Sequence, residues 1–216
     1  MDKVKSLELL LDGAHKVGVS LSQDAANKLL QFREELTRWN RKVNLTAITD
    51  PTEILEKHFI DSLAVVPQVS GATSLLDVGS GGGFPGIPIK LALPNLDVTL
   101  LESSGRKVAF LKHALATLEM GDRIRVTESR AEGQPEAERV ARAGVVISRA
   151  LQTPADWVAL GRKYVAESGC LIAMLGSKWG PQEIEAIARQ NGGTVEIRSY
   201  HLPFSGARRA FAVFRF

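Results

Sequence analysis

The sequence predicts an α/β fold with a mostly parallel sheet, an antiparallel strand at its edge and a group of helices before the sheet. The first seventy residues keep the apolar spacing of helices, and the chain from residue 71 alternates strand-like with helical runs. Two strand-like runs then follow one another at the end of the chain. Alternating strands and helices form crossover units and hence a parallel sheet. We therefore expect a helical extension over 1–70 and one compact α/β domain over 71–216.

The extension is expected to contain three helices. Over 4–17, apolar residues at a spacing of three and four line one helical face. A second helix, over 20–39, opens on a Ser-x-x-Gln capping box at Ser20. The third, over 50–67, opens on an aspartate N-cap followed by proline in the first helical position.

The α/β part is expected to contain five strands before the closing pair, at 75–78, 98–102, 123–127, 145–148 and 171–175. Helices fit between and after them at 87–93, 106–119, 135–141, 154–167 and 182–190. The closing strand-like runs lie at 194–202 and 210–216, and their adjacency indicates an antiparallel hairpin at the sheet edge.

The most informative stretch is a glycine-rich turn that directly follows the first expected strand. The next strand ends in Glu102, about twenty residues further on. A doubly wound sheet uses this combination of turn and acidic residue to hold the ribose of a nucleoside cofactor. Two cofactors fit it, a nicotinamide dinucleotide and S-adenosylmethionine.

The positions of the acidic residues favour S-adenosylmethionine. A literal Gly-x-Gly-x-x-Gly match begins at Gly81, but it is separated from the strand and contains a proline. Asp77 at the strand end would crowd a pyrophosphate, whereas S-adenosylmethionine has a sulfonium and an amino group that an acid attracts. Glu102 can accept hydrogen bonds from both ribose hydroxyls, and Gly79-x-Gly81-x-Gly83 forms the turn. With the closing hairpin, this indicates a Rossmann-like class I methyltransferase sheet.

Composition excludes several classes of protein. With 216 residues, no apolar run of eighteen and no basic-then-apolar leader, the chain is expected to be cytoplasmic, neither membrane-spanning nor secreted. The single Cys170 lies in an apolar run, so we expect a buried strand residue and no disulfide framework. The four histidines lack ligand-like spacing, so no metal site is expected.

Two segments are rich in cations although the net charge is only +3. Residues 36–49 contain three cations and no acid, and residues 205–216 contain three arginines and no acid. An ordinary solvated surface is the simpler interpretation of each segment alone. If the substrate is RNA, the candidate phosphate contacts are Arg38, Arg41, Lys42, Arg208 and Arg209.

Five stretches, in order over nearly the whole chain, match a known family: WNRKVNLT at 39–46, HFIDS at 58–62, DVGSGGGFPGIP at 77–88, ESSGRKVAFL at 102–111 and ISRA at 147–150. On these stretches the sequence resembles the small-subunit ribosomal RNA guanine-N7 methyltransferases once called glucose-inhibited division protein B (RsmG). The first and third stretches contain elements specific to this family. The resemblance implies S-adenosyl-L-methionine as cofactor, 16S ribosomal RNA or the small ribosomal subunit as partner, and no obligate protein partner.

The resemblance also implies roles for individual residues. Gly79 and Phe84 would hold the methionine end and flank the reactive methyl group. Ala131 and Glu132 would contact the adenine edge, and Arg149 would sit over the cofactor and the incoming base as the catalytic residue. From the residues themselves, Phe84 is awkward to bury inside a glycine turn, and Arg149 at the end of an apolar strand needs a partner.

Two positions depart from the family pattern as we know it. Family members usually have Lys-Gly after the fifth strand, where this chain has Leu175-Gly176 with Lys178 two residues later. They also tend to have Arg-His-Leu before the last strand, where this chain reads Arg209-Ala210. Both departures concern the docking of the target more than methyl transfer.

The expected reaction is direct in-line transfer of a methyl group to guanine N7. This nitrogen has an exposed lone pair and no proton, so no general base is required. In paired RNA it faces a groove that side chains cannot enter, so the base should be unpaired or extruded. Phe84, Trp39 and Trp179 are candidates for an aromatic surface beside the cationic product. The alternatives are a small-molecule methyltransferase and an RNA-binding assembly factor with the same fold.

Overall fold

The computed structural model describes residues 2–149, 153–176 and 179–216. The last residue of the 147–150 stretch and Lys178 therefore lie outside the described residues. The first two helices are α1 (Lys3–Lys16) and α2 (Gln23–Val43), as expected. The N-cap of α2 is Ser22, whose hydroxyl accepts from the Ala25 amide at 3.1 Å, so the cap lies two residues after the predicted Ser20. An N-cap side chain accepts a hydrogen bond from the second or third amide of the helix, and in α2 it is Ser22 that does so.

The third helix of the extension is divided into short pieces. In order they are α3 (Pro51–Ile54), the π-helix η1 (Leu55–Ile60), α4 (Asp61–Leu63) and α5 (Val66–Val69). Its start is as predicted, because one oxygen of Asp50 accepts from the amides of Thr52 and Glu53, each at 2.9 Å. The prediction of one continuous α-helix over 50–67 is wrong in its middle, where the chain forms the wider π-helix. Such π turns are frequent at functional sites.

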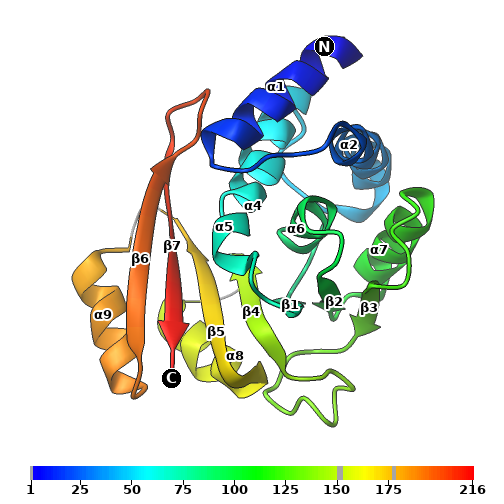
Figure 1. The fold of residues 1–216 in the computed structure, drawn as a ribbon. Helices are drawn as coiled ribbons and strands as arrows, with labels where there is room; N and C mark the ends of the chain where they lie inside the picture. Colours follow the sequence, from blue (N-terminus) through cyan, green and yellow to red (C-terminus); the bar gives the residue numbers. More distant parts are fainter. Residues whose placement is uncertain (1, 150–152, 177–178) are drawn as a thin grey trace.

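The sheet has the strand order β3-β2-β1-β4-β5-β7-β6. The strands are β1 (Ser74–Val78), β2 (Asp97–Glu102), β3 (Ile124–Glu128), β4 (Ala143–Arg149), β5 (Val165–Leu175), β6 (Thr194–His201) and β7 (Arg208–Arg215). The pairs among β1 to β5 are parallel, and β7 is antiparallel to both β5 and β6. This confirms the predicted fold class, with the closing hairpin at one edge and β7 inside it (Figure 1).

Helices cover both faces of the sheet (Figure 1). The helices after the extension are α6 (Gly86–Ala92), α7 (Gly105–Thr117), α8 (Pro154–Gly161), the 3-10 helix η2 (Arg162–Tyr164) and α9 (Pro181–Gln190). The extension, α6 and α7 lie on one face, and α8 and α9 lie on the other.

Two sequence predictions in this part are wrong. The helix expected at 135–141 is a series of turns. The helix expected over 154–167 ends earlier, and β5 begins six residues before its predicted start at 171. As predicted, Cys170 is a buried residue of a strand.

The extension and the sheet share one hydrophobic core. Leu10, Phe32 and Phe59 of the extension belong to the same buried cluster as Phe110 of α7 and Ile147 of β4. A second cluster on the opposite face is formed mainly by β4, β5, β7, α8 and α9. The 1–70 segment is thus packed onto the α/β part over a large apolar surface, which is what fixes its polar residues relative to the sheet.

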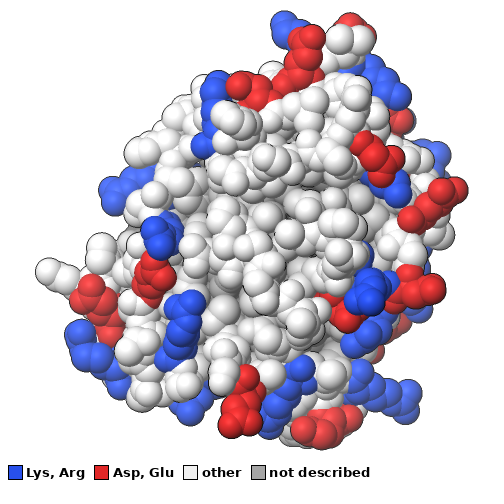
Figure 2. All heavy atoms as spheres, viewed as in Figure 1, with Lys and Arg blue, Asp and Glu red and all other residues white. Residues whose placement is uncertain are grey.

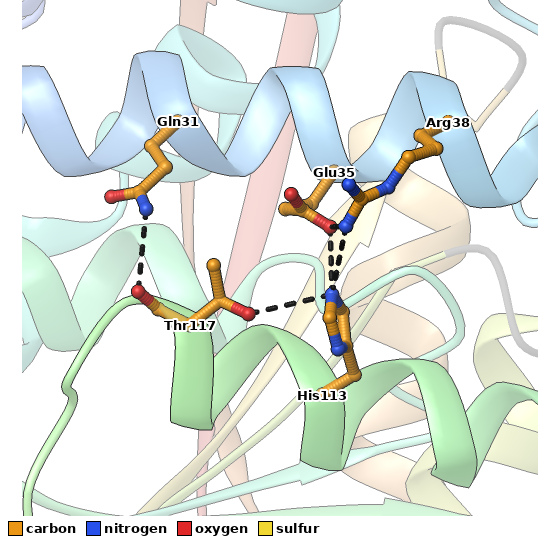
Figure 3. Close-up of polar contacts among 5 residues, drawn as sticks. All are labelled: Gln31, Glu35, Arg38, His113 and Thr117. Carbon is orange, nitrogen blue, oxygen red and sulfur yellow. Dashed lines mark hydrogen bonds and ion pairs between the residues drawn. The ribbon is translucent and has the colours of Figure 1, made fainter.

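A polar contact also joins α2 to α7 (Figure 3). Glu35 of α2 accepts from His113 Nε2 of α7 at 2.7 Å and forms an ion pair with Arg38. Gln31 donates to the Thr117 carbonyl at 3.3 Å. Within the described part of the chain, no helix is both long and apolar enough to cross a membrane.

Candidate cofactor and RNA site

The turn after β1 needs its glycines. Gly79, Gly81 and Gly83 have φ angles of 72°, 56° and 88°, in the left-handed region that glycine adopts without steric cost. A Cβ on Gly83 would also lie 2.6 Å from Ile87 Cδ1. The chain therefore curls tightly at the carboxyl end of β1, where ligands bind in open α/β sheets.

Asp77 supports this turn from inside the protein. Its side chain is fully buried, and Oδ2 accepts from the Gly86 amide at 2.9 Å. A Cβ on Gly86 would lie 2.8 Å from the same oxygen, so glycine permits the close approach. Burial raises the pKa of Asp77 to about 7, against the lowering effects of the Gly86 hydrogen bond and the charge of Arg149. Oδ1 has no hydrogen-bond partner among the described residues.

Glu102 lies at the carboxyl end of β2, next to β1 in the sheet. Its Oε2 accepts from the Gly81 amide and its Oε1 from the Ser104 amide, each at 2.9 Å. A carboxylate oxygen has two lone pairs, so both oxygens can accept a further hydrogen bond. The two acidic residues that the sequence singled out thus hold the same turn from two neighbouring strands.

Phe84 is buried, contrary to the expectation that a glycine turn would leave it exposed. Its side chain is 4% exposed, and its ring packs on Phe32 and Phe59 and stacks on His58 with centroids 4.5 Å apart. The extension supplies these aromatic neighbours, which the local sequence around the turn does not reveal. The guanidinium of Arg149 lies 5.0 Å from the ring centroid, within the range of a cation–π contact.

Arg149, the last residue of β4, has the partner that its position requires. One nitrogen lies 3.8 Å from Asp61 Oδ2 and donates to the Lys57 carbonyl at 3.3 Å. Burial lowers its pKa, while Asp61 and Asp77 raise it. Its side chain is 21% exposed, so the guanidinium is held in place and still reaches solvent.

Asp61 is at the centre of a cluster that the sequence analysis did not identify. Oδ1 accepts from the Tyr200 hydroxyl at 2.8 Å and lies 3.6 Å from Arg209 Nε. Burial raises the pKa of Asp61, while Tyr200, Arg149 and Arg209 lower it. The signal that could have indicated this cluster is the presence of Asp61 and His58 on one apolar helix, because polar side chains that become buried need partners. His58, three residues earlier, has its pKa lowered to about 3, chiefly by burial, and is neutral at pH 7.

The segment with Ala131 and Glu132 is fixed by another buried pair. Glu138 Oε1 accepts from the amides of Glu132 and Gln134, at 2.9 and 2.8 Å. The Tyr164 hydroxyl donates to Glu138 Oε2 at 2.5 Å and accepts from the Gly133 amide at 2.7 Å. The turns that replace the predicted helix at 135–141 bring Glu138 to this segment, and no local pattern indicated that.

The five candidate RNA contacts fall into two groups. Arg38 is paired with Glu35 (Figure 3). Arg209 is close to Asp61. Arg41, Lys42 and Arg208 are exposed and have no ion pair among the described residues. On the face seen in Figure 2, cations and acids are interspersed around the rim, and the middle is largely uncharged. Electrostatic attraction over this face is therefore local.

The tryptophans occupy different surroundings. Trp39 packs on Phe110 and His113, with centroids 5.7 and 5.2 Å away, and Trp179 is partly buried against the second core. Within the described residues, no group of three or more histidine, cysteine or acidic side chains could hold a metal ion.

Comparison with known proteins identifies the family. The model of the GidB family, rRNA small subunit methyltransferase G, matches residues 25–209. A protein of Myxococcus xanthus named "Ribosomal RNA small subunit methyltransferase G" is 49% identical over 99% of both chains. One of the same name from an Anaeromyxobacter species is 43% identical over 94% of both chains.

Solved structures agree in fold. An O-methyltransferase from Bacillus cereus, solved in complex with SAH, has a TM-score of 0.58 at 18% identity, over 85% of this chain and 90% of that one. A ribosomal protein L11 methylase from Lactobacillus delbrueckii has a TM-score of 0.56 at 14% identity, over 73% and 77%. With a methyltransferase fold, a glycine turn held by two strand-end acids and relatives over its whole length, the chain belongs to the GidB family of rRNA small subunit methyltransferases G.

Proposed function

We propose that this protein transfers the methyl group of S-adenosyl-L-methionine to N7 of a specific guanine in 16S ribosomal RNA. Family membership over residues 25–209 and the names of its relatives support the reaction. The single observation on which the proposal depends is the turn at Gly79–Gly83, held by Asp77 and Glu102 at the carboxyl ends of neighbouring strands. A ribosomal substrate implies a cytoplasmic location.

The residues present fit this cofactor. Among the described residues, the buried Asp77 Oδ1 has no hydrogen-bond partner, and the ionised form of this carboxyl would favour a cationic ligand at the turn. Glu102 retains acceptor capacity for two ribose hydroxyls. When bound, S-adenosylmethionine supplies an electrophilic methyl group on a sulfonium. Gly79, Gly81 and Gly83 let the backbone approach it closely.

We assign the remaining roles in the same way. Gly79 and the part of the turn next to Phe84 would border the methionine end of the cofactor. Ala131 and Glu132 would border its adenine. Arg149 would lie against the incoming guanine, since it is partly exposed and fixed above the ring of Phe84. The buried Phe84 acts through its packing, because little of its ring is accessible to a ligand.

Methyl transfer to N7 needs positioning and no proton removal. The N7 lone pair is available at neutral pH, so the reaction requires no general base. His58 is neutral at pH 7 and is assigned no proton transfer. Approach geometry alone can supply roughly 7–11 kcal/mol of the barrier. The hydrogen bond to the Lys57 carbonyl and the ion pair with Asp61 hold the Arg149 guanidinium in the position from which it would orient the base.

Phosphate contacts are proposed for all five basic candidates. Among the described residues, Arg41, Lys42 and Arg208 have no ion pair to give up when they bind a phosphate. Neutralising Arg41 and Lys42 together is expected to reduce the salt dependence of RNA binding by about two in the slope of log affinity against log salt. An unchanged slope would remove these two residues from the interface.

The proposal is tested by tritium transfer from labelled S-adenosylmethionine to small ribosomal subunits that lack the modification, with free 16S RNA in parallel. Label recovered as 7-methylguanine at one site is the expected result, and the two substrates show which one is recognised. No label despite measurable cofactor binding would contradict the proposal. Transfer to a free metabolite instead would indicate a small-molecule methyltransferase.

A further inference from the structure

A pocket lies beside the glycine turn, between the end of α2 and the loop at 44–49. It has a volume of about 390 Å³. Its lining includes Leu36, Arg41, Asn44, Thr46, Ile48 and Thr49. This lining includes no acidic side chain, and none of the cofactor residues proposed above contributes to it.

The loop that forms one wall is fixed by hydrogen bonds. Asn40 Oδ1 accepts from the amides of Leu45 and Thr46, at 2.7 and 2.9 Å, and its Nδ2 donates to the Thr46 carbonyl at 2.8 Å. Asn44, at the C-cap of α2, has a φ of 49° and turns the chain into the loop. The wall is therefore preorganised, so little ordering is needed when a ligand binds.

The pocket is next to the proposed methyl site. Thr46 Oγ1 lies 2.7 Å from His58 Nε2, and the His58 ring stacks on Phe84. A Cβ on Gly82 of the turn would lie 3.4 Å from the Leu36 side chain and 3.5 Å from the Leu45 carbonyl. The pocket and the turn thus share one wall.

The chemistry of the lining suits a nucleotide. Ile48 is partly exposed and can contact the face of a base, whereas Leu36 and Ile54 of the lining are buried in the core. Asn44 and Thr49 are exposed, and within the described part of the chain their side chains make no hydrogen bond, so they can bind the base edge. The exposed Arg41 guanidinium is available for a phosphate.

We propose that this pocket binds a nucleotide of the substrate RNA adjoining the target guanine, with its base against Ile48 and its phosphate on Arg41. This inference rests on the proposed function. N7 of a stacked and paired guanine is inaccessible, so the enzyme must hold the RNA in an unstacked form. Binding a neighbouring base at a fixed site next to the turn would oppose restacking.

The test fills the pocket without changing charge. Thr49→Trp places a bulky side chain in the lining, and Ala47→Trp, at an exposed position of the same loop outside the lining, is the matched control. RNA affinity is measured by filter binding, and KM and kcat by tritium transfer. We expect Thr49→Trp to weaken RNA binding and raise the RNA KM roughly tenfold. The Kd for S-adenosylmethionine should not change, and Ala47→Trp should resemble the wild type.

A second variant covers the case in which Thr49→Trp does not fold. Asn44→Gly removes the amide and keeps the left-handed backbone, and it should raise the RNA KM less. Unchanged RNA affinity in both variants would overturn the inference. An effect on intact subunits without one on protein-free RNA would also overturn it, because a ribosomal protein would then be the occupant.

The binding measurement needs no methyl transfer. Failure of the proposed function would appear as a wild type that binds RNA and transfers no label, whereas failure of the pocket would appear as a variant that binds like the wild type. A photo-crosslinking amino acid at position 49 should attach to a nucleotide adjoining the methylated guanine. Attachment only to distant nucleotides would contradict the inference.

Discussion

Two carboxylates of the helical extension join it to the rest of the chain, in different surroundings. Glu35 of α2 is buried, and it contacts two side chains that reach water, Arg38 of its own helix and His113 of α7 (Figure 3). The side chain of Arg38 is 63% exposed. Water therefore hydrates the partners of Glu35, which reduces what this contact contributes to stability.

Asp61 of α4 contacts groups from three strands and is itself buried. Its partners are Arg149 of β4, Tyr200 of β6 and Arg209 of β7. Removing the buried member of such an ion pair leaves partners that water hydrates only in part, which costs more than an exposed pair contributes. The comparison indicates that α2 is attached to α7 mainly by apolar packing, whereas α4 is attached to the site by charge.

The largest expected effect is that of Asp61→Ala. It leaves Arg149 and Arg209 without their shared counter-ion, so the free energy of unfolding should fall by about 3–5 kcal/mol. Urea unfolding measures it, and methyl transfer should fall because Arg149 is no longer fixed above Phe84. Asp61→Asn, which can still accept from Tyr200, is the control and should lose less. A loss below about 1 kcal/mol for Asp61→Ala would show that the Asp61 cluster contributes no more to stability than an exposed ion pair does.

Asp77 extends the comparison to a buried acid that is not in an ion pair. Its pKa is about 7 in the folded protein, against 3.8 for an unperturbed aspartate. The folded state therefore binds a proton that the unfolded state releases between these values, and the free energy of unfolding falls as pH rises through this window. The full difference corresponds to roughly 4 kcal/mol. Relative to Asp77→Asn, wild-type stability should decline from pH 4 to 7, and parallel curves would contradict the assignment.

Tyr200→Phe tests one hydrogen bond of the Asp61 cluster. The hydroxyl donates to Asp61 Oδ1 at 2.8 Å, and a hydrogen bond to a charged group contributes about 1.5–3 kcal/mol. The free energy of unfolding should fall by that amount in urea. Because Arg149 and Arg209 still face the acid, methyl transfer should fall less than in Asp61→Ala. A larger loss of activity than of stability would instead assign Tyr200 a direct part in the site.

The fold was predictable because its signals are local. Apolar runs marked the strands, and Gly79, Gly81 and Gly83 marked a turn that only glycine forms readily. The errors occurred where distant residues decide the outcome. The segment at 135–141 has turns in place of a helix, with Glu138 holding another segment through its carboxylate.

The site was predictable in its backbone and less so in its side chains. Asp77 and Glu102 stand where strand ends meet a turn, as the sequence indicated. The burial of Phe84 depends on rings of the extension, and Asp61 and Tyr200 are 139 residues apart. Such contacts require the packing of α4 against the sheet, which no single stretch of sequence specifies.

The smallest expected effect is that of Glu35→Gln. It removes the carboxylate charge that Arg38 and His113 contact. Their side chains are 63% and 34% exposed, and ion pairs with exposed partners contribute about 0.2–1 kcal/mol. A double-mutant cycle with His113→Gln isolates the contact between α2 and α7. The coupling energy should decrease further in high salt, because these side chains reach water. Methyl transfer should be unchanged, since α2 keeps its apolar packing. A coupling of several kcal/mol would show that charge, and not packing, attaches α2 to α7.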